Sequence, residues 1–324
     1  MSLVAHFLAE RAPRVPTGCA HPPVALTFEI SGPAGVSAFA LELRDGEAVV
    51  SERAPEGAHK VRCTEDEFQS LLDGRRELLG PFWHEHLPME FGWAAALYAF
   101  FFPRHDYLRL SPVLKELYKD SGAWPVVTPF TQGYRLYELV LRRRLNLTLE
   151  IGLGTGGSAL FLAEAHKALG CGHHFAADPY QEALYGNRAL KAIAKAGLQD
   201  FFTALPSTGR AALRAFSRAQ VPFDLVYIDG DHSASAVLSD FLGANACLRQ
   251  GGLLAFDDSH WPSGRQVLQL IDRHYPYRVL GEHCSDRLTV LQKVAHSRGP
   301  ASVRLASWWG ELKASLLQAF GHRA

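Results

Sequence analysis

The stretch TLEIGLGTGGS, from Thr148 to Ser158, sets the interpretation of the rest of this chain. The apolar run Leu145 to Ile151 predicts a short strand, and glycines follow it at positions 152, 154, 156 and 157. From Ser158 to Leu169 the chain is rich in alanine and leucine at helical spacing, so a helix is expected there. A strand, a glycine turn and a helix in this order place bare backbone N–H groups at a helix start, where a ligand can approach them.

A second apolar run, from His174 to Ala177, ends in Asp178. A carboxylate at the end of this strand can accept hydrogen bonds from both hydroxyls of a ribose. Asp178 is therefore a candidate for binding the ribose of a nucleoside cofactor. A tight turn that binds no ligand is the alternative interpretation of the glycine stretch, and Asp178 counts against it.

The cofactor class depends on Glu150. Gly152, Gly154 and Gly157 also fit the G-x-G-x-x-G pattern of dinucleotide sites, which is weak by itself. A carboxylate two residues before the first glycine would repel a pyrophosphate, but it suits a cofactor that carries an ammonium and a sulfonium. An NAD-dependent oxidoreductase remains an alternative, disfavoured by Glu150 and by the lack of a recognisable set of hydride-transfer residues.

Composition restricts the possible partners and compartments. The 324 residues are 48% hydrophobic and 20% charged, as in soluble globular proteins, and the chain is long enough for two domains. Lysine plus arginine equals aspartate plus glutamate at 33 each, so we expect no nucleic-acid partner. The five scattered cysteines suggest reduced thiols and a cytoplasmic protein without a zinc site. The most apolar stretch, Phe91 to Phe102, is too short to cross a bilayer, and no signal peptide is recognisable, so no stable membrane insertion is expected.

The N-terminal hundred residues predict a small α+β domain. Alternating runs indicate strands at Val24 to Ile30, Val36 to Asp45, Glu47 to Glu52 and His59 to Thr64, with a hairpin turn at Asp45-Gly46. Thr64 and Glu67 form a capping box, so a helix should begin there and end at Asp73-Gly74.

This segment resembles a sterol carrier protein type 2 domain. The resemblance rests on the ISGP turn, the LELRDGE hairpin, the strand into TEDEF, the LLDG helix end and a final apolar helix. It implies a five-stranded sheet with helices around an apolar tunnel that could hold a hydrophobic ligand. The bulky side chains of Trp93, Phe100, Phe101 and Phe102 favour a filled interior, and thus a packed scaffold or a dimer surface.

The second half of the chain predicts further strands and helices in alternation. A helix is expected from Tyr134 to Arg144, where it would cover the methionine end of the cofactor. Strands are expected at Asp200 to Leu205, within PFDLVYIDGDHS (222–233), within LLAFDDSH (253–260), and as a closing pair at Tyr277 to Leu280 and Arg287 to Lys293. Ligands of open α/β sheets bind at the carboxyl ends of the strands. One crevice should therefore contain the ionisable groups of Asp178, Asp229, His232, Asp257 and Asp258.

The order of these motifs resembles the class I S-adenosylmethionine-dependent methyltransferases. The matching residues are EIGLGTGGS, ADPYQ, FDLVYIDGDH and LRQGGLLAFDD, and Glu150, Gly152, Gly154 and Gly156 fit the E-x-G-x-G-x-G motif of that class. The resemblance implies a seven-stranded Rossmann-like sheet. It also implies S-adenosylmethionine bound by Glu150, Gly152, Gly154, Gly156, Ser158, Asp178, Ser207, Thr208 and Asp229. Ser207 and Thr208 would face the adenine, although either could instead cap the next helix.

Within that class, the closest resemblance is to the metal-dependent natural-product O-methyltransferases. It implies Mg²⁺ held by Asp229, Asp257 and Asp258, and His232 as the general base. Asp-Gly-Asp-His as a helix cap and Asp-Asp-Ser as a turn are the structural alternatives. His260 and Glu282 remain open as substrate contacts.

Together these patterns predict an S-adenosylmethionine-dependent methyltransferase with Mg²⁺ that methylates a hydroxyl of a small secondary metabolite. The alternatives are a metal-free N-methyltransferase and a hydrophobic-ligand binding protein that acts through its N-terminal domain. The expected organisation is a sterol-carrier-like domain at 1–103, a linker at 104–130, a methyltransferase domain at 131–295 and a C-terminal amphipathic helix at 296–324. The N-terminal domain or the helix Val303 to Phe320 could form a homodimer.

Overall fold

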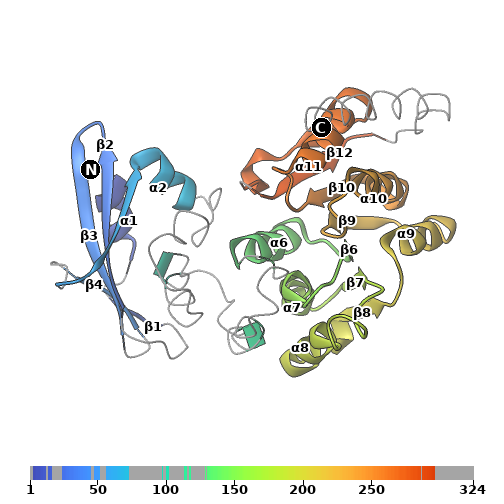
Figure 1. The fold of residues 1–324 in the computed structure, drawn as a ribbon, viewed down its shortest axis with the longest axis horizontal. Coiled ribbons are helices and arrows are strands. Elements are labelled where there is room, and N and C mark those ends of the chain that lie inside the picture. The colour runs from blue at the N-terminus through green and yellow to red at the C-terminus, as the bar shows by residue number, and fades with distance from the viewer. Residues whose placement is uncertain are drawn as a thin grey trace, which may run out of the picture.

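The structure is a computed structural model that describes residues 3–11, 14–16, 24–44, 47–51, 56–72, 130–285 and 287–295, with isolated positions at 97, 100, 101, 113, 114, 117 and 128. It contains a five-stranded sheet and a seven-stranded sheet that share no strand (Figure 1). Most of the predicted linker and the predicted C-terminal helix, Val303 to Phe320, lie outside the described residues.

The N-terminal sheet has the order β1-β4-β3-β2-β5. Its elements are α1 (Leu3–Ala9), β1 (Arg14–Pro16), β2 (Val24–Gly32), β3 (Gly35–Arg44), β4 (Glu47–Ser51), β5 (His59–Thr64) and α2 (Glu65–Leu72). The expected capping box is confirmed, because the backbone N–H of Thr64 donates to Glu67 Oε2 at 2.8 Å and that of Glu67 donates to Thr64 Oγ1 at 3.2 Å. The predicted hairpin is also present, since β3 and β4 pair antiparallel as far as Arg44 and Glu47.

Aromatic rings fill the described interior of this N-terminal unit. Phe28 and Phe39 stack with ring centroids 4.7 Å apart, and Phe7 stacks on Phe101 at 5.4 Å. Phe100 is fully buried within the same cluster. These contacts agree with the expected packed interior at the positions the structure describes. Trp93 and Phe102 lie outside those positions.

The larger sheet has the order β11-β12-β10-β9-β6-β7-β8, and β12 alone runs antiparallel to its neighbours. Its strands are β6 (Leu147–Ile151), β7 (His173–Ala177), β8 (Phe202–Leu205), β9 (Phe223–Ile228), β10 (Leu248–Phe256), β11 (Tyr277–Val279) and β12 (Thr289–Lys293). The α-helices are α6 (Phe130–Arg143), α7 (Gly157–Leu169), α8 (Arg188–Ala196), α9 (Gly209–Arg218), α10 (Ala234–Cys247) and α11 (Pro262–His274). Short 3₁₀ helices are η3 (Gln199–Phe201) and η4 (Gly281–His283). The predicted mixed α/β fold with a seven-stranded sheet is confirmed.

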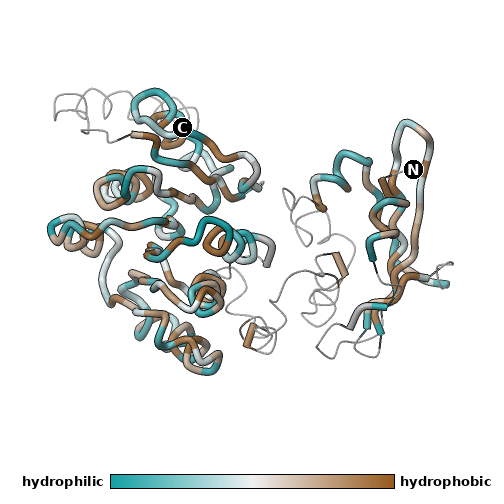
Figure 2. Tube along the Cα trace, turned by 180° about the vertical axis from the view of Figure 1, so that it is seen from behind, coloured by the Kyte–Doolittle hydropathy of each residue, from teal (hydrophilic) through white to brown (hydrophobic). Residues whose placement is uncertain are grey.

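Helices cover both faces of this sheet. Alternate residues of β9 enter two separate cores: Leu225 and Tyr227 pack with α6, α7 and α8, whereas Val226 and Ile228 pack with α9, α10 and α11. This arrangement follows from the two-residue side-chain period of a strand. Figure 1 shows α7 and α10 on opposite sides of the strands, and Figure 2 shows hydrophobic residues both on the strands and on the helices that cover them.

The strand order reverses between β6 and β9. From β6 the chain moves outward through β7 and β8, and then returns to β9 on the other side of β6. Such a switch point leaves a crevice at the carboxyl ends of the two strands, where open α/β sheets bind their ligands. No helix among the described residues is long and apolar enough to cross a membrane.

Candidate active site

Four hydrogen bonds continue the sheet one residue past its strands and place the candidate residues in one row. They run from the backbone N–H groups of Asp178, Gly152, Asp229 and Asp257 to the carbonyls that end the neighbouring strands, at Leu205, Ala177, Ile151 and Ile228, over 2.8–3.1 Å. Because the four acceptors end β8, β7, β6 and β9, the predicted cofactor and acidic residues lie side by side at one edge. The structure thus brings these four residues together at the carboxyl ends of the strands.

The glycine turn adopts a conformation that other residues rarely adopt. Gly152, Gly154 and Gly156 have φ values of 92°, 52° and 91°. A Cβ on Gly152 would lie 2.1 Å from the carbonyl oxygen of Asp229, and one on Gly156 would lie 2.8 Å from the Cβ of Ala189. The glycine turn thus packs closely against the end of β9 and the start of α8. It leads into α7, and Ser158 is buried at the start of that helix.

Asp178 holds the glycine turn in place. Its Oδ2 accepts hydrogen bonds from the backbone N–H groups of Leu153 at 3.2 Å and Gly154 at 2.9 Å, and its Oδ1 accepts one from Tyr180 N at 2.7 Å. Gln181 adds a second link, because its Nε2 donates to the carbonyl of Gly154 at 2.7 Å. Asp178 therefore positions the loop that the sequence assigned to cofactor binding.

Glu150 is completely buried on β6, and neither of its carboxylate oxygens has a hydrogen-bond partner in the described structure. Burial raises the pKa of the Glu150 carboxyl well above its usual value, an effect that the Ser158 hydroxyl opposes and the charge of Asp178 reinforces. A buried acid of this kind requires a proton or a nearby cation. The environment of Glu150 thus suits a cationic ligand.

Two histidines extend this buried polar group from Glu150 towards the start of β6. Thr148 Oγ1 lies 2.8 Å from His166 Nε2 and 2.9 Å from His174 Nδ1, and His174 Nε2 lies 3.4 Å from a carboxylate oxygen of Glu150. Burial lowers the pKa of each histidine to about 3. Both rings are therefore neutral at physiological pH.

We expect these two histidines to make the fold acid-sensitive. The folded pKa of about 3 is depressed below the ordinary histidine value of 6.5, so the unfolded chain binds more protons between these values. The stabilising contribution is complete above pH 6.5 and is lost as pH falls towards 3. Denaturant unfolding from pH 7.5 to 5 should show that His166→Asn reduces the slope of unfolding free energy by about 1.4 kcal/mol per pH unit below pH 6. The exposed His6→Gln should leave the slope unchanged, and an equal slope in both variants would contradict the prediction.

Asp229 and Asp257 form a hydrogen-bonded group with two side chains that sequence reasoning did not single out. Tyr227 donates to Asp229 Oδ2 at 3.1 Å, and Gln132 Nε2 donates to Tyr227 Oη at 2.6 Å and to Asp257 Oδ1 at 2.7 Å. Burial, and then the negative charge of Asp257, raise the pKa of Asp229 well above its usual value. The two carboxyl groups thus lie close to each other under α6.

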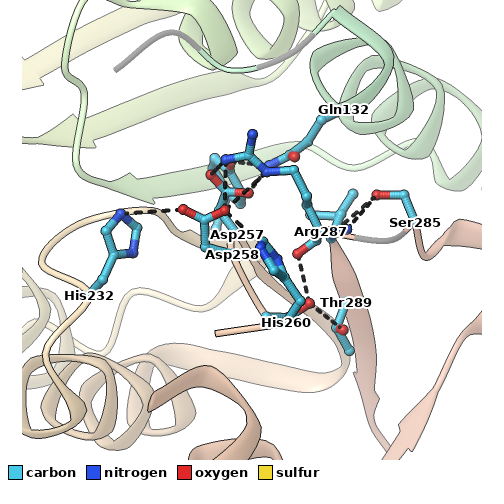
Figure 3. Close-up of polar contacts among 11 residues, drawn as sticks. Gln132, His232, Asp257, Asp258, His260, Ser285, Arg287 and Thr289 are labelled. Carbon is cyan, nitrogen blue, oxygen red and sulfur yellow. Dashed lines mark hydrogen bonds and ion pairs between the residues drawn. The ribbon is translucent and has the colours of Figure 1, made fainter. Parts of the chain in front are cut away.

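Asp258 faces a different set of groups. The guanidinium of Arg287 contacts its Oδ1 through Nε at 3.0 Å and Nη2 at 2.7 Å (Figure 3). His232 Nε2 lies 3.7 Å from Asp258 Oδ2, and His260 Nδ1 lies 3.9 Å from Oδ1. The ring of Trp261, 44% exposed, lies 5.0 Å from that of His232. The predicted base therefore lies beside a carboxylate and an exposed aromatic ring.

The three predicted metal ligands are not arranged as a metal site. Among the described residues, no group of three or more histidine, cysteine, aspartate or glutamate side chains is placed to hold a metal ion. Each of the three carboxylates instead accepts a hydrogen bond within the protein, Asp229 from Tyr227, Asp257 from Gln132 and Asp258 from Arg287. This arrangement does not fit the expected Mg²⁺ centre.

Other candidate residues have local structural roles. Thr208 is the N-cap of α9, because its side chain accepts from the backbone N–H of Ala211 at 3.3 Å, and Ser207 precedes it. The cap of α10 is Ser233, whose own N–H donates to Asp231. The side chain of Glu282 lies outside the described residues.

The functional residues that sequence reasoning missed are Gln132, Tyr227 and Arg287. Gln132 and Arg287 are separated from Asp257 by 125 and 30 positions, and nothing in their local sequence marks them as partners of an acid. Tyr227 offered a weak signal, since a phenol two residues before a strand-end acid must find a hydrogen-bond partner when it is buried.

Residues 149–259 match a family described as "Methyltransferase domain". No curated protein matches the sequence. Among solved structures, the chain resembles cofactor-bound Rv0187 from MTB with 20% identity and a TM-score of 0.50, over 64% of this chain and 98% of that one. It also resembles the O-methyltransferase TomG from Streptomyces achromogenes in complex with SAM, with 20% identity and a TM-score of 0.46, over 58% of this chain and 90% of that one.

The matched family covers the glycine turn, Asp178, His232 and the paired aspartates, and the first of these structural similarities supports the fold. The chain therefore contains a methyltransferase domain, which makes it an enzyme.

Proposed function

We propose that this protein transfers the methyl group of S-adenosylmethionine to a hydroxyl of a small secondary metabolite, with His232 as general base. The observation that carries the proposal is the position of His232 beside Asp258, at the strand edge that also holds the glycine turn. A base next to an orienting carboxylate is a recurrent arrangement for removing a proton from a weak nucleophile.

The cofactor site is proposed at the turn from Gly152 to Ser158. Its left-handed glycines leave the backbone open to a ligand, and the unpartnered buried carboxylate of Glu150 favours a cationic one. The hydroxyl of Thr155 in the same turn is also buried without a hydrogen-bond partner. Asp178 would hold the turn and reach the ribose, with Asp229 near the methionine end and Ser207 and Thr208 near the adenine.

Bound S-adenosylmethionine supplies an electrophilic methyl group on a positively charged sulfur. The side chains near Asp258 would then act on the acceptor. Because His232 Nε2 faces Asp258, Nδ1 is the ring nitrogen left to take the hydroxyl proton. Asp258 would stabilise the resulting imidazolium, and the exposed ring of Trp261 offers an apolar surface for the acceptor. The hydroxyl oxygen forms the new bond to the methyl carbon as the bond from that carbon to sulfur breaks.

The magnesium ion expected from the resemblance is not used in this scheme. The guanidinium of Arg287 already lies against Asp257 and Asp258, so a positive charge faces these carboxylates without a metal ion. N-methylation remains the second candidate, because an amine acceptor needs no metal to be nucleophilic.

For the rest of the chain we propose a sterol-carrier-like N-terminal domain at 1–103 that serves as a scaffold or dimer surface, a linker at 104–130 and the catalytic domain at 131–295. The close packing of Phe7, Phe28, Phe39 and Phe101 supports a scaffold over a hydrophobic-ligand carrier. Native mass spectrometry that found a stoichiometric hydrophobic ligand would favour the carrier. A cytoplasmic location is part of the proposal.

Cofactor binding gives the direct test. Calorimetry should show that S-adenosylhomocysteine binds and NAD does not, and that Glu150→Gln weakens binding by about tenfold or more, the equivalent of 1.4 kcal/mol. The matched control is Glu138→Gln, whose carboxylate pairs with Arg142 on the exposed side of α6 and should leave affinity unchanged. Binding of NAD without binding of S-adenosylhomocysteine would overturn the proposed function.

A further inference from the structure

The guanidinium of Arg287 lies against the two aspartates that follow β10, Asp257 and Asp258. Besides its two contacts with Asp258 Oδ1, the Arg287 guanidinium places Nη2 3.8 Å from Asp257 Oδ2. Figure 3 shows the guanidinium pointing into the group formed by Asp257, Asp258 and Gln132. The positive charge therefore lies next to two of the three carboxylates that the sequence assigned to a divalent metal.

The backbone fixes this guanidinium in position. The carbonyl of Arg287 accepts hydrogen bonds from Ser259 N at 2.9 Å and Ser259 Oγ at 2.7 Å, and Thr289 Oγ1 donates to Ser259 Oγ at 2.9 Å. Ser285 Oγ accepts from the N–H of Leu288 at 3.1 Å. Hydrogen bonds thus join the loop that carries Arg287 to the turn that carries Asp257 and Asp258. The backbone holds both partners of the ion pair in place, unlike in an isolated ion pair on the surface.

The ion pair is also sheltered from water. The side chain of Asp258 is 8% exposed and that of Arg287 34% exposed, so solvent screens their interaction less than it would at the surface. Asp258 has a φ of 45°, a strained value for a non-glycine residue. The fold thus holds Asp258 in an uncommon conformation that turns its carboxylate between Arg287 and His232.

From this geometry we infer that Arg287 is a built-in replacement for a divalent metal in this enzyme. It balances the charge of Asp257 and Asp258 and holds the Asp258 carboxylate beside His232. Arginine does not lose its proton in proteins, so this charge does not depend on pH or on metal supply. In catalysis Arg287 is a positioning residue that acts through Asp258, and this last step alone rests on the proposed function.

The test is metal uptake. Titration with Mn²⁺, followed by electron paramagnetic resonance, should show no stoichiometric binding to the parent protein, and EDTA should leave its melting temperature unchanged. Removing the guanidinium in Arg287→Ala should expose the carboxylates, lower the melting temperature by about 5 °C and create one Mn²⁺ site per chain. Mn²⁺ should then restore most of the lost melting temperature.

Two further variants make the result decisive. Arg287→Lys should keep a cation and gain no metal site, and it replaces the alanine variant if that one fails to fold. Arg278→Ala, which removes an exposed arginine from the neighbouring strand β11, should behave as the parent. Stoichiometric Mn²⁺ binding by the parent that Asp257→Asn abolishes would overturn the inference, and so would an Arg287→Ala protein that folds and takes up no metal. Neither readout involves methyl transfer, so failure of the proposed function would show separately, as absent S-adenosylhomocysteine binding.

Discussion

Replacing Gly152 with alanine is expected to remove cofactor binding and to destabilise the protein by about 2 to 5 kcal/mol. An alanine Cβ at this position would lie 2.1 Å from the carbonyl oxygen of Asp229 and 2.6 Å from its carbonyl carbon. Both are backbone atoms of the adjoining strand end, so no side chain can rotate away to relieve the clash. The substitution should therefore push β6 and β9 apart at the point where their loops meet.

Gly170→Ala provides the matched control for this prediction. Gly170 also has a positive φ, of 69°, but a Cβ there would meet no atom within 4 Å. Its alanine variant should lose only the conformational cost, about 1 kcal/mol, and keep its affinity for S-adenosylhomocysteine. Urea unfolding and calorimetry would measure both quantities. Similar losses in the two variants would mean that contact with Asp229 is not what requires a glycine at position 152.

His232→Ala should reduce turnover by about 10²- to 10⁴-fold, the range expected when a general base is lost. Because the side chain of His232 is 36% exposed and its partner Asp258 is also held by Arg287, the fold and cofactor binding should survive. Activity should recover in part at higher pH, where more of the acceptor hydroxyl is ionised without help. A steady-state pH profile of kcat with saturating cofactor would measure this.

His260→Ala is the variant that tests whether the base is assigned to the right histidine. His260 also faces Asp258, at 3.9 Å, and directly precedes Trp261 in the sequence, whereas His232 lies in the loop after β9. We expect it to lose far less activity than His232→Ala and to show an unchanged pH profile. A larger loss in His260→Ala would move the base to that residue. Parent-like turnover of His232→Ala at every pH would favour an acceptor that is already nucleophilic, such as an amine.

The sequence was sufficient to predict the seven strands of the catalytic domain and the helix after the glycine turn. The apolar runs that end at Ile151, Ala177 and Ile228 are all strands, and Gly152, Gly154 and Gly156 in the predicted glycine turn adopt the left-handed conformation that glycine tolerates. These features are local: a strand follows from residue type and period, and a turn follows from which residues tolerate positive φ. The capping box at Thr64 and Glu67 was predictable for the same reason, since its partners are three positions apart.

The sequence also placed the acidic residues at the correct edge of the sheet. Parallel strands that alternate with helices must all end at the same edge, so Asp178, Asp229 and Asp257 were expected to lie together, and the ladder of backbone hydrogen bonds aligns them. Thr208 could not be assigned from sequence because a hydroxyl before a helix serves a cap or a ligand equally well. The structure shows the cap.

The contacts of these side chains were decided only by the tertiary structure. Asp178 accepts two hydrogen bonds from the glycine turn, and Asp258 meets the guanidinium of Arg287, which is 29 positions away in the chain. Strand periodicity determines which edge an acid occupies, but it carries no information about which distant donor reaches that edge. The pairing of β10 with β12 brings Arg287 next to Asp258. Because of this long-range packing, Asp258, which the sequence predicted as a metal ligand, instead pairs with the guanidinium of Arg287.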